Sequence, residues 1–171
     1  SHTRRRPLAD LFINLGFIKP THISRDPRDA ALSAYEYGQR APEGKESLPK
    51  GLRYFSQLST IEDAIHWMEK YVQIAEGWLS CSQALNLRYE DLLLDYENEV
   101  QRLIDFLGIE EKSPAIEAAI EKYDPSKKSS REKGTHFSKG KIGRYQTLFT
   151  EEQKTLSKKI FGSYLRKRGY E

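Results

Sequence analysis

The chain has 171 residues, of which 37% are hydrophobic and 31% are charged. A chain of this length can bury a hydrophobic core, and no apolar run approaches the ~18 residues that span a bilayer. The 28 basic and 25 acidic residues give a net charge of +3, without the strong basic excess that is typical of nucleic-acid-binding proteins. The single cysteine, Cys81, excludes an internal disulfide and favours a reducing, cytoplasmic compartment.

The first half of the chain carries strong helix signals and one short β-prone run. Apolar residues at helical spacing predict a helix within 7–18, with Gly16 as its C-terminal cap. A strand is expected at 21–24. Asp26 and Pro27 then begin a helix that stops at Gly38. After a surface loop at 39–59, Thr60 with Asp63 begins an amphipathic helix whose apolar stripe consists of Ile61, Ala64, Ile65, Met68, Val72, Ala75 and Leu79.

The second half repeats the pattern of a strand followed by a helix. Residues 85–89 predict the second strand, and the following helices begin at Asp95 and Ser113. Residues 124–147 are basic and irregular, and Thr150 with Gln153 predicts a capping box for the last helix. Two strands that each lead into a helix indicate an α/β fold, in which functional groups lie at strand ends and helix N-termini.

The segment around Arg25 is the first candidate site. Arg25 follows the predicted strand and precedes a helix N-terminus, so a guanidinium, free amides and the positive end of the helix dipole converge there. Ser33 lies about two turns along the helix and could donate its hydroxyl to the same anion. The alternative is that Arg25 and Arg28 pair with Asp26 and Asp29 on the surface.

This segment, SRDPRDAALSAY, resembles the 3′-phosphate-binding segment of the cytosolic and bacterial sulfotransferases. In that family an Arg-(Asp/Asn)-Pro-(Arg/Lys)-Asp string follows a strand, and a serine stands eight residues after the first arginine. The resemblance implies that Arg25 and Ser33 bind the 3′-phosphate of the sulfuryl donor.

Two further segments resemble the same family, in the family's order. LNLRYEDLLLDYENEVQRLIDFLGI is similar to its strand ending in Tyr-Glu-Asp and the helix that follows, which implies that Tyr89 contacts the donor's adenosine. Packing of Tyr89 at the edge of a core is the alternative.

The third segment, HFSKGKIGRYQTLFT, resembles the family's loop that closes over the 3′-phosphate, here Ser138, Lys139 and Gly140. Ser138 stands where the family has an arginine, so a bidentate phosphate contact is lost. Lys139, Lys141 and Arg144 could supply the missing charge. A basic loop that binds no ligand is the alternative.

The resemblance implies a fold and a reaction. The fold would be α/β, a P-loop-like parallel sheet flanked by helices, and we interpret residues 1–171 as one partial domain, truncated at its N-terminus. The donor would be 3′-phosphoadenosine 5′-phosphosulfate and the product 3′,5′-bisphosphoadenosine. His2, which lies 23 residues before Arg25, matches the catalytic base. The family's 5′-phosphosulfate loop has no match here, so this chain alone is expected to be inactive.

Two other classes of function stay open. One is a nonenzymatic module that binds a nucleotide or a partner. The other is a polyanion-binding surface formed by Lys127, Lys128, Arg131, Lys133, Lys139 and Lys141, which the balanced charge disfavours. We expect a small-molecule or glycan acceptor, no nucleic-acid or membrane partner, and no metal site at the histidines His22, His66 and His136. Acceptor identity and oligomeric state are not predicted.

Overall fold

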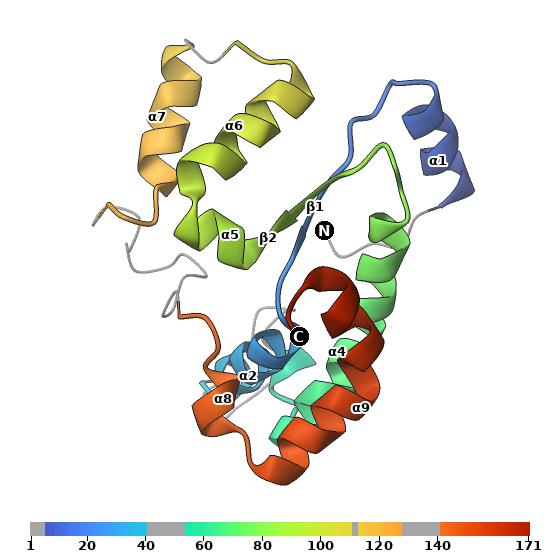
Figure 1. Ribbon diagram of the computed structural model, residues 1–171, viewed down its shortest axis with the longest axis vertical. Helices are drawn as coiled ribbons and strands as arrows, with labels where there is room; N and C mark the ends of the chain where they lie inside the picture. Colours follow the sequence, from blue (N-terminus) through green and yellow to red (C-terminus); the bar gives the residue numbers. More distant parts are fainter. Residues whose placement is uncertain (1–5, 41–53, 111–112, 128–140) are drawn as a thin grey trace. The chain divides into compact units, whose positions relative to one another are not determined.

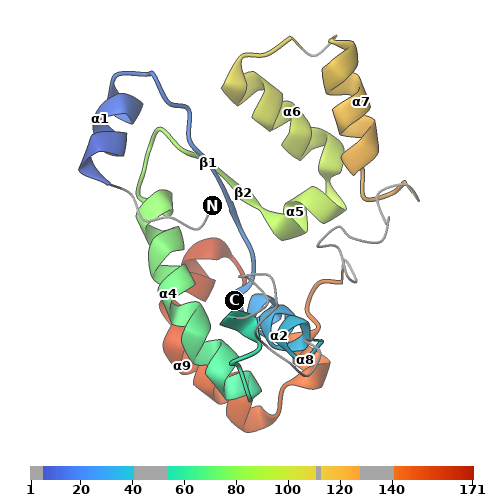
Figure 2. The same cartoon turned by 180° about the vertical axis from the view of Figure 1, so that it is seen from behind.

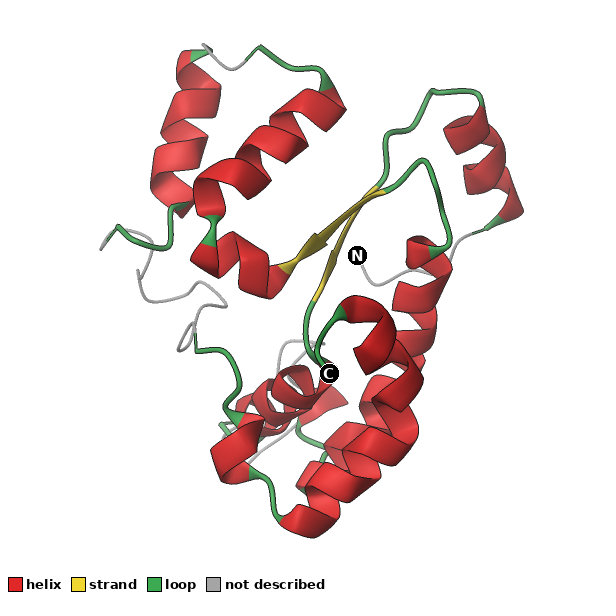
Figure 3. Ribbon diagram, viewed as in Figure 1, coloured by secondary structure: helices red, strands yellow, loops and turns green. Residues whose placement is uncertain are grey.

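The computed structural model describes residues 6–40, 54–110, 113–127 and 141–171. They form helices and one two-stranded sheet (Figure 3). The chain divides into two compact units: the first combines Arg25–Gly77 with Ile142–Glu171, and the second combines Arg5–Ser24 with Trp78–Lys141. That residues 1–171 form one partial domain therefore stays a prediction. Within the described ranges, no helix has both the length and the apolar character needed to cross a bilayer.

A parallel pair of strands organises the second unit. Strand β1 (Thr21–Ser24) pairs with β2 (Leu85–Arg88), and Ser24 lies opposite Arg88 at the carboxyl ends. The sequence predicted both strands, but β2 ends one residue earlier than expected because Tyr89 begins a helix. The helices of this unit are α1 (Pro7–Asn14), α5 (Tyr89–Leu94), α6 (Tyr96–Leu107) and α7 (Pro114–Tyr123). The helix-rich α/β class with a parallel sheet is confirmed.

The helices of the second unit begin and end close to the predicted residues. Gly16 and Gly108 adopt φ values of 76° and 68°, the left-handed conformation that ends a helix. Helices α6 and α7 lie side by side (Figures 1 and 2), and the Tyr96 hydroxyl donates a 3.0 Å hydrogen bond to the carbonyl of Ile120. Helix α5 was not predicted. Asp95 stands at the N-cap of α6, but its carboxylate accepts the side-chain amide of Asn98 instead of capping the helix.

Among its described residues, the first unit contains the helices α2 (Pro27–Gly38), α4 (Ile61–Leu79), the short α8 (Tyr145–Leu148) and α9 (Glu151–Arg168). The last two residues of α4 fall in the second unit. Helix α9 runs beside α4 (Figures 1 and 2), where Gln153 donates a 2.8 Å hydrogen bond to Glu62. The predicted capping box of Thr150 and Gln153 is present. Helix α8 lies in a segment that was predicted to be irregular. The buried apolar side chains of this unit include Ala31, Leu32, Ala64, Ile65, Val72, Phe161 and Leu165.

A close backbone approach joins the end of α2 to residues 54–55. A Cβ atom added at Gly38 would lie 2.0 Å from the carbonyl oxygen of Phe55, so only glycine fits without a shift of the backbone. The Phe55 ring adds side-chain contacts at the same place. It packs against Tyr37 of α2 and Trp67 of α4 at centroid distances of 5.6 and 4.9 Å. Gly38 therefore helps to fix α2 against α4.

We expect Gly38→Ala to lower the free energy of unfolding by about 1–3 kcal/mol, because the added methyl group overpacks a backbone contact. Gly77→Ala is the matched control: a Cβ added there meets nothing within 4 Å, inside helix α4. Alanine at that position should stabilise the protein by about 0.5–1 kcal/mol. Urea unfolding of both variants measures the contrast, and equal effects at the two glycines would contradict the close approach.

Candidate functional site

Arg25 and Ser33 meet in the first unit, as the sequence predicted. Arg25 is the residue after β1, and Ser33 lies two turns into α2. The Nη1 atom of Arg25 donates a 3.2 Å hydrogen bond to Oγ of Ser33. Both residues are half-buried. A guanidinium and a hydroxyl thus lie side by side, and both can donate hydrogen bonds to a phosphate oxygen.

The N-terminus of α2 contributes to this site differently from the expectation. Pro27 has no N–H group, the Arg28 amide donates to the Asp26 carboxylate at 2.9 Å, and the Ala30 amide donates to the Asp26 carbonyl. These first-turn positions therefore offer an anion no free amide. The positive end of the helix dipole remains, and Arg25 and Ser33 are the candidate groups for specific contacts with an anion.

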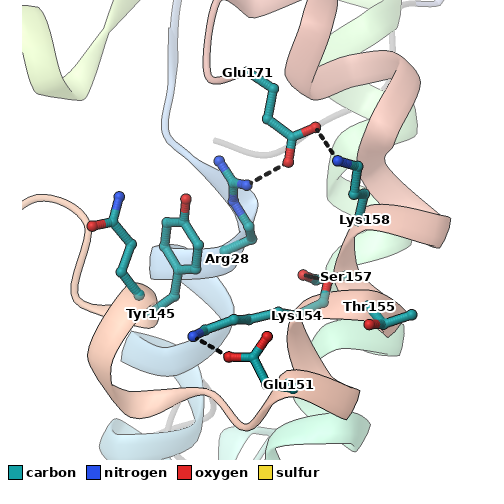
Figure 4. Close-up of a pocket in the computed structure, with 9 residues that line it drawn as sticks. Arg28, Tyr145, Glu151, Lys154, Thr155, Ser157, Lys158 and Glu171 are labelled. Atoms are coloured by element: carbon teal, nitrogen blue, oxygen red, sulfur yellow. Dashed lines mark hydrogen bonds and ion pairs between the residues drawn. The ribbon is translucent and has the colours of Figure 1, made fainter.

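Arg28 has a structural role that separates it from Arg25. Its side chain is buried, and its guanidinium binds the Asp26 carboxylate through Nε–Oδ1 at 3.0 Å and Nη2–Oδ2 at 2.8 Å. The same group reaches Oε1 of Glu171 at 2.9 Å and stacks over the ring of Tyr145 at 4.1 Å (Figure 4). Burial lowers the pKa of Arg28, but the hydrogen bonds and charge of Asp26, with the charge of Glu171, outweigh burial and leave the pKa raised.

The surface pairing considered for Arg25 and Arg28 is therefore only partly present. Arg28 does pair with Asp26, but the pair is buried, with both side chains less than a tenth exposed. Asp29 is also buried, and its carboxylate accepts the backbone amides of Gly143 and Tyr145 at 2.6 and 3.0 Å. The two arginines thus separate into a buried structural cation and a half-buried candidate ligand.

A pocket of about 400 Å³ lies beside Arg28, between α8, α9 and the end of the sequence (Figure 4). Its other lining side chains include Tyr145, Lys154, Lys158 and Glu171. The positive charges here are balanced, because Lys154 pairs with Glu151 at 2.8 Å and Lys158 lies 3.9 Å from Glu171. Neither Arg25 nor Ser33 lines this pocket, so we do not assign the phosphate to it.

The side chain of Arg144 is bound to α2. Its guanidinium forms a two-pronged ion pair with Glu36, and its side chain is 10% exposed. This ion pair disfavours the possibility that Arg144, with Lys139 and Lys141, supplies the charge of the arginine missing at position 138. No local sequence pattern predicts this contact, since Arg144 and Glu36 lie 108 positions apart. Lys141, by contrast, is exposed.

The other predicted site residues belong to the second unit or lie outside the described residues. Tyr89 is half-buried and is the first residue of α5, so both the adenosine contact and the core-edge alternative stay open. His2 and the segment Ser138, Lys139 and Gly140 lie outside the described residues. His22 contacts the side-chain oxygen of Asn86 at 3.1 Å.

Asp29 and Glu36 are the residues that the sequence analysis did not assign to the site. They stand four residues before and three residues after Ser33, on the same face of α2. That spacing can be read from the sequence. The partners of the two carboxylates cannot.

Comparison with known proteins identifies the family. Residues 16–169 match the sulfotransferase domain family model, so the chain belongs to the sulfotransferase family, as the three segments implied. A 3-alpha-hydroxysteroid sulfotransferase of Cavia porcellus is 26% identical over 163 residues, which cover 84% of this chain and 54% of the relative.

A solved structure supports the fold. Mouse sulfotransferase SULT7A1, crystallised with PAP, superposes with a TM-score of 0.60 at 20% sequence identity. The match covers 93% of this chain and 62% of the mouse chain. The present chain thus spans little more than half the length of the relatives it matches.

Proposed function

We propose that this chain supplies the 3′-phosphate and adenosine side of a sulfotransferase donor site, and that the donor is 3′-phosphoadenosine 5′-phosphosulfate. The contact between Arg25 and Ser33 carries the proposal. It places two groups that can donate hydrogen bonds to a phosphate side by side, within the residues that match the family. The mouse structure, whose ligand is PAP, supports the choice of a bisphosphonucleotide.

The remaining ligands are proposed on the resemblance. Tyr89 would contact the adenosine, and Ser138, Lys139 and Gly140 would close over the 3′-phosphate. Arg25 directly follows strand β1 and Tyr89 directly follows strand β2, and the end of a strand is a usual place for a functional group in α/β folds.

In the proposed reaction an acceptor hydroxyl or amine attacks the sulfur of the donor. The new bond to sulfur forms as the bond between sulfur and the 5′-phosphate oxygen breaks, and 3′,5′-bisphosphoadenosine leaves. His2 would take the proton of the acceptor. Arg25 and Ser33 would hold the distant phosphate and so fix the donor relative to the attacking atom, which lowers the entropic part of the barrier. We propose a cytoplasmic location and a small-molecule or glycan acceptor.

A nonenzymatic nucleotide-binding module is the second candidate. The contact between Arg25 and Ser33 fits this candidate as well, because binding of the 3′-phosphate does not require transfer. Such a module would keep the 3′-phosphate contacts of Arg25 and Ser33 but would not transfer the sulfuryl group.

Calorimetry on this chain tests the proposal. We expect 3′,5′-bisphosphoadenosine to bind at least about tenfold more tightly than adenosine 5′-monophosphate, because a charge-assisted phosphate contact contributes about 1.5–3 kcal/mol. Equal affinity for the two nucleotides would refute a 3′-phosphate site. An assay with labelled donor then favours the enzyme if the chain transfers the sulfuryl group, whereas binding without transfer is expected of this chain under both candidates.

A further inference from the structure

Helix α1 exposes its apolar side. Apolar side chains that repeat at helical spacing normally face a protein core. The one buried residue of α1 is Ile13, which lies on the other side of the helix from the apolar stripe. Among the described residues the stripe is only partly covered, because each of its side chains is 40–66% exposed. The stripe consists of Leu8, Leu11, Phe12 and Leu15.

Two further apolar residues extend the stripe beyond the end of α1. Gly16, with a φ of 76°, turns the chain there, and the amides of Phe17 and Ile18 donate to the carbonyl of Phe12 at 2.9 and 3.3 Å. The ring of Phe17 lies edge-on to the ring of Phe12, with 6.2 Å between their centroids. Phe17 and Ile18 are exposed as well. We call the combined surface the α1 patch. It consists of Leu8, Leu11, Phe12, Leu15, Phe17 and Ile18.

Other contacts attach α1 to the second unit. The side-chain amide of Gln83 donates a 3.0 Å hydrogen bond to the side-chain oxygen of Asn14. Just beyond the patch, the ammonium group of Lys19 donates to the carbonyl of Leu107 at 2.9 Å. All four residues belong to this unit, as does the buried Ile13. Turning the patch inward would break these contacts, so they fix its outward orientation.

The size of the α1 patch suits a protein interface. Its residues expose on the order of 700 Å² of mostly apolar surface. The largest apolar patch of a typical monomer is about 300–600 Å², and each partner of a stable interface buries about 800 Å². From Leu11 to Ile18 the chain contains no charged residue. Helix α1 contains no lysine or arginine, so it lacks the basic polar face of helices that bind membrane surfaces.

We propose that the α1 patch is the interface of a homodimer, in which α1 packs antiparallel against α1 of a second copy of this chain. A stripe at positions i, i+3, i+4 and i+7 is complementary to an identical stripe, and two-fold symmetry places the same surface of each copy on the other. Leu11 lies near the middle of α1, so the antiparallel pairing brings the two copies of Leu11 close to the symmetry axis. This interface does not depend on the proposed function.

Sedimentation equilibrium of the chain over a range of concentrations measures the dimer. We expect Leu11→Glu to raise the dissociation constant at least about a hundredfold, because each dimer would then bury two carboxylates in an apolar interface. Leu94→Glu is the matched control. Leu94 is 77% exposed at the end of α5, in the same unit, so the same substitution there should leave the dissociation constant unchanged. Circular dichroism establishes that both variants are folded.

A mixture of Leu11→Glu and Leu11→Lys tests the pairing of the two helices. Each variant alone places like charges together across the symmetry axis, whereas the mixture places opposite charges together. We therefore expect the mixture to dimerise at least about tenfold more tightly than either variant alone. If Leu11→Glu does not fold, Leu15→Gln replaces it, with an expected rise in the dissociation constant of about tenfold.

Three results would overturn the proposal. An unsubstituted chain that stays monomeric at every concentration would show that another polypeptide segment or a different partner covers the α1 patch. A dimer that is as stable in Leu11→Glu as in the unsubstituted chain would place the interface elsewhere. No gain in the mixture of the two charged variants would exclude the antiparallel pairing about Leu11.

Discussion

Replacing Arg28 with alanine is expected to lower the free energy of unfolding of the first unit by about 3–5 kcal/mol. The substitution removes the cation from a buried pair and deprives the Asp26 carboxylate, which is 8% exposed, of the guanidinium. It also removes the stacking of the guanidinium on Tyr145 and the contact with Glu171. Removing one member of a buried ion pair costs far more than the net gain from the intact pair, so the loss should be large although the backbone amide of residue 28 still donates to Asp26.

Urea unfolding followed by tryptophan fluorescence measures this loss in the unit concerned. Trp67 lies in the first unit, where it packs against Phe55 and Tyr71, whereas Trp78 belongs to the second. A Trp78→Phe background therefore makes the signal report on the first unit.

Lys167→Ala is the control for loss of an ion pair. Lys167 pairs with Glu76 at 3.4 Å, and both side chains are more than a third exposed. We expect a change of at most about 1 kcal/mol from this variant. Equal losses from Arg28→Ala and Lys167→Ala would contradict the structural role of Arg28.

Replacing Arg25 with alanine is expected to weaken the binding of 3′,5′-bisphosphoadenosine about ten- to a hundredfold. The loss corresponds to one charge-assisted contact, about 1.5–3 kcal/mol. Ser33 would keep its hydroxyl but lose the guanidinium that lies 3.2 Å away. The affinity of Arg25→Lys should lie between those of the unsubstituted chain and Arg25→Ala, because lysine keeps the charge and loses the planar, two-pronged geometry.

Two comparisons make this result specific. Adenosine 5′-monophosphate lacks the 3′-phosphate, so its affinity should be nearly unaffected by Arg25→Ala. Arg40→Ala removes an exposed positive charge just beyond the end of α2 and should leave both affinities unchanged. Parallel losses for both nucleotides, or a loss in Arg40→Ala equal to that in Arg25→Ala, would show that Arg25 does not bind the 3′-phosphate.

The sequence predicted well what short-range chemistry controls. Asp26 caps α2, Thr150 and Gln153 form their capping box, and Gly108 ends α6, because each of these signals acts within a few residues. The contact of Arg25 with Ser33 was predictable for the same reason, since Arg25 directly precedes the N-cap of α2 and Ser33 lies two turns into that helix.

The partners of charged side chains were harder to predict. Asp29 binds amides more than 110 residues away, and Arg144 binds Glu36 across 108 residues. No local pattern specifies such contacts, because only the packing of α8 on α2 brings the groups together. Helix α5 was missed for another reason: it follows β2 directly, without a side-chain hydrogen bond at its N-cap.

The twelve residues from Arg25 to Glu36 contain the proposed phosphate ligands, Arg25 and Ser33, and also Asp29 and Glu36, which bind residues 143–145. One inserted residue within α2 would rotate everything after it by about 100° and move it by about 1.5 Å along the axis. An insertion between Asp29 and Ser33 would therefore turn the hydroxyl away from Arg25 while Asp29 kept its amides. Over evolutionary time this stretch should tolerate substitutions at outward-facing positions but almost no change in length, so gaps in homologous sequences are expected to fall outside it.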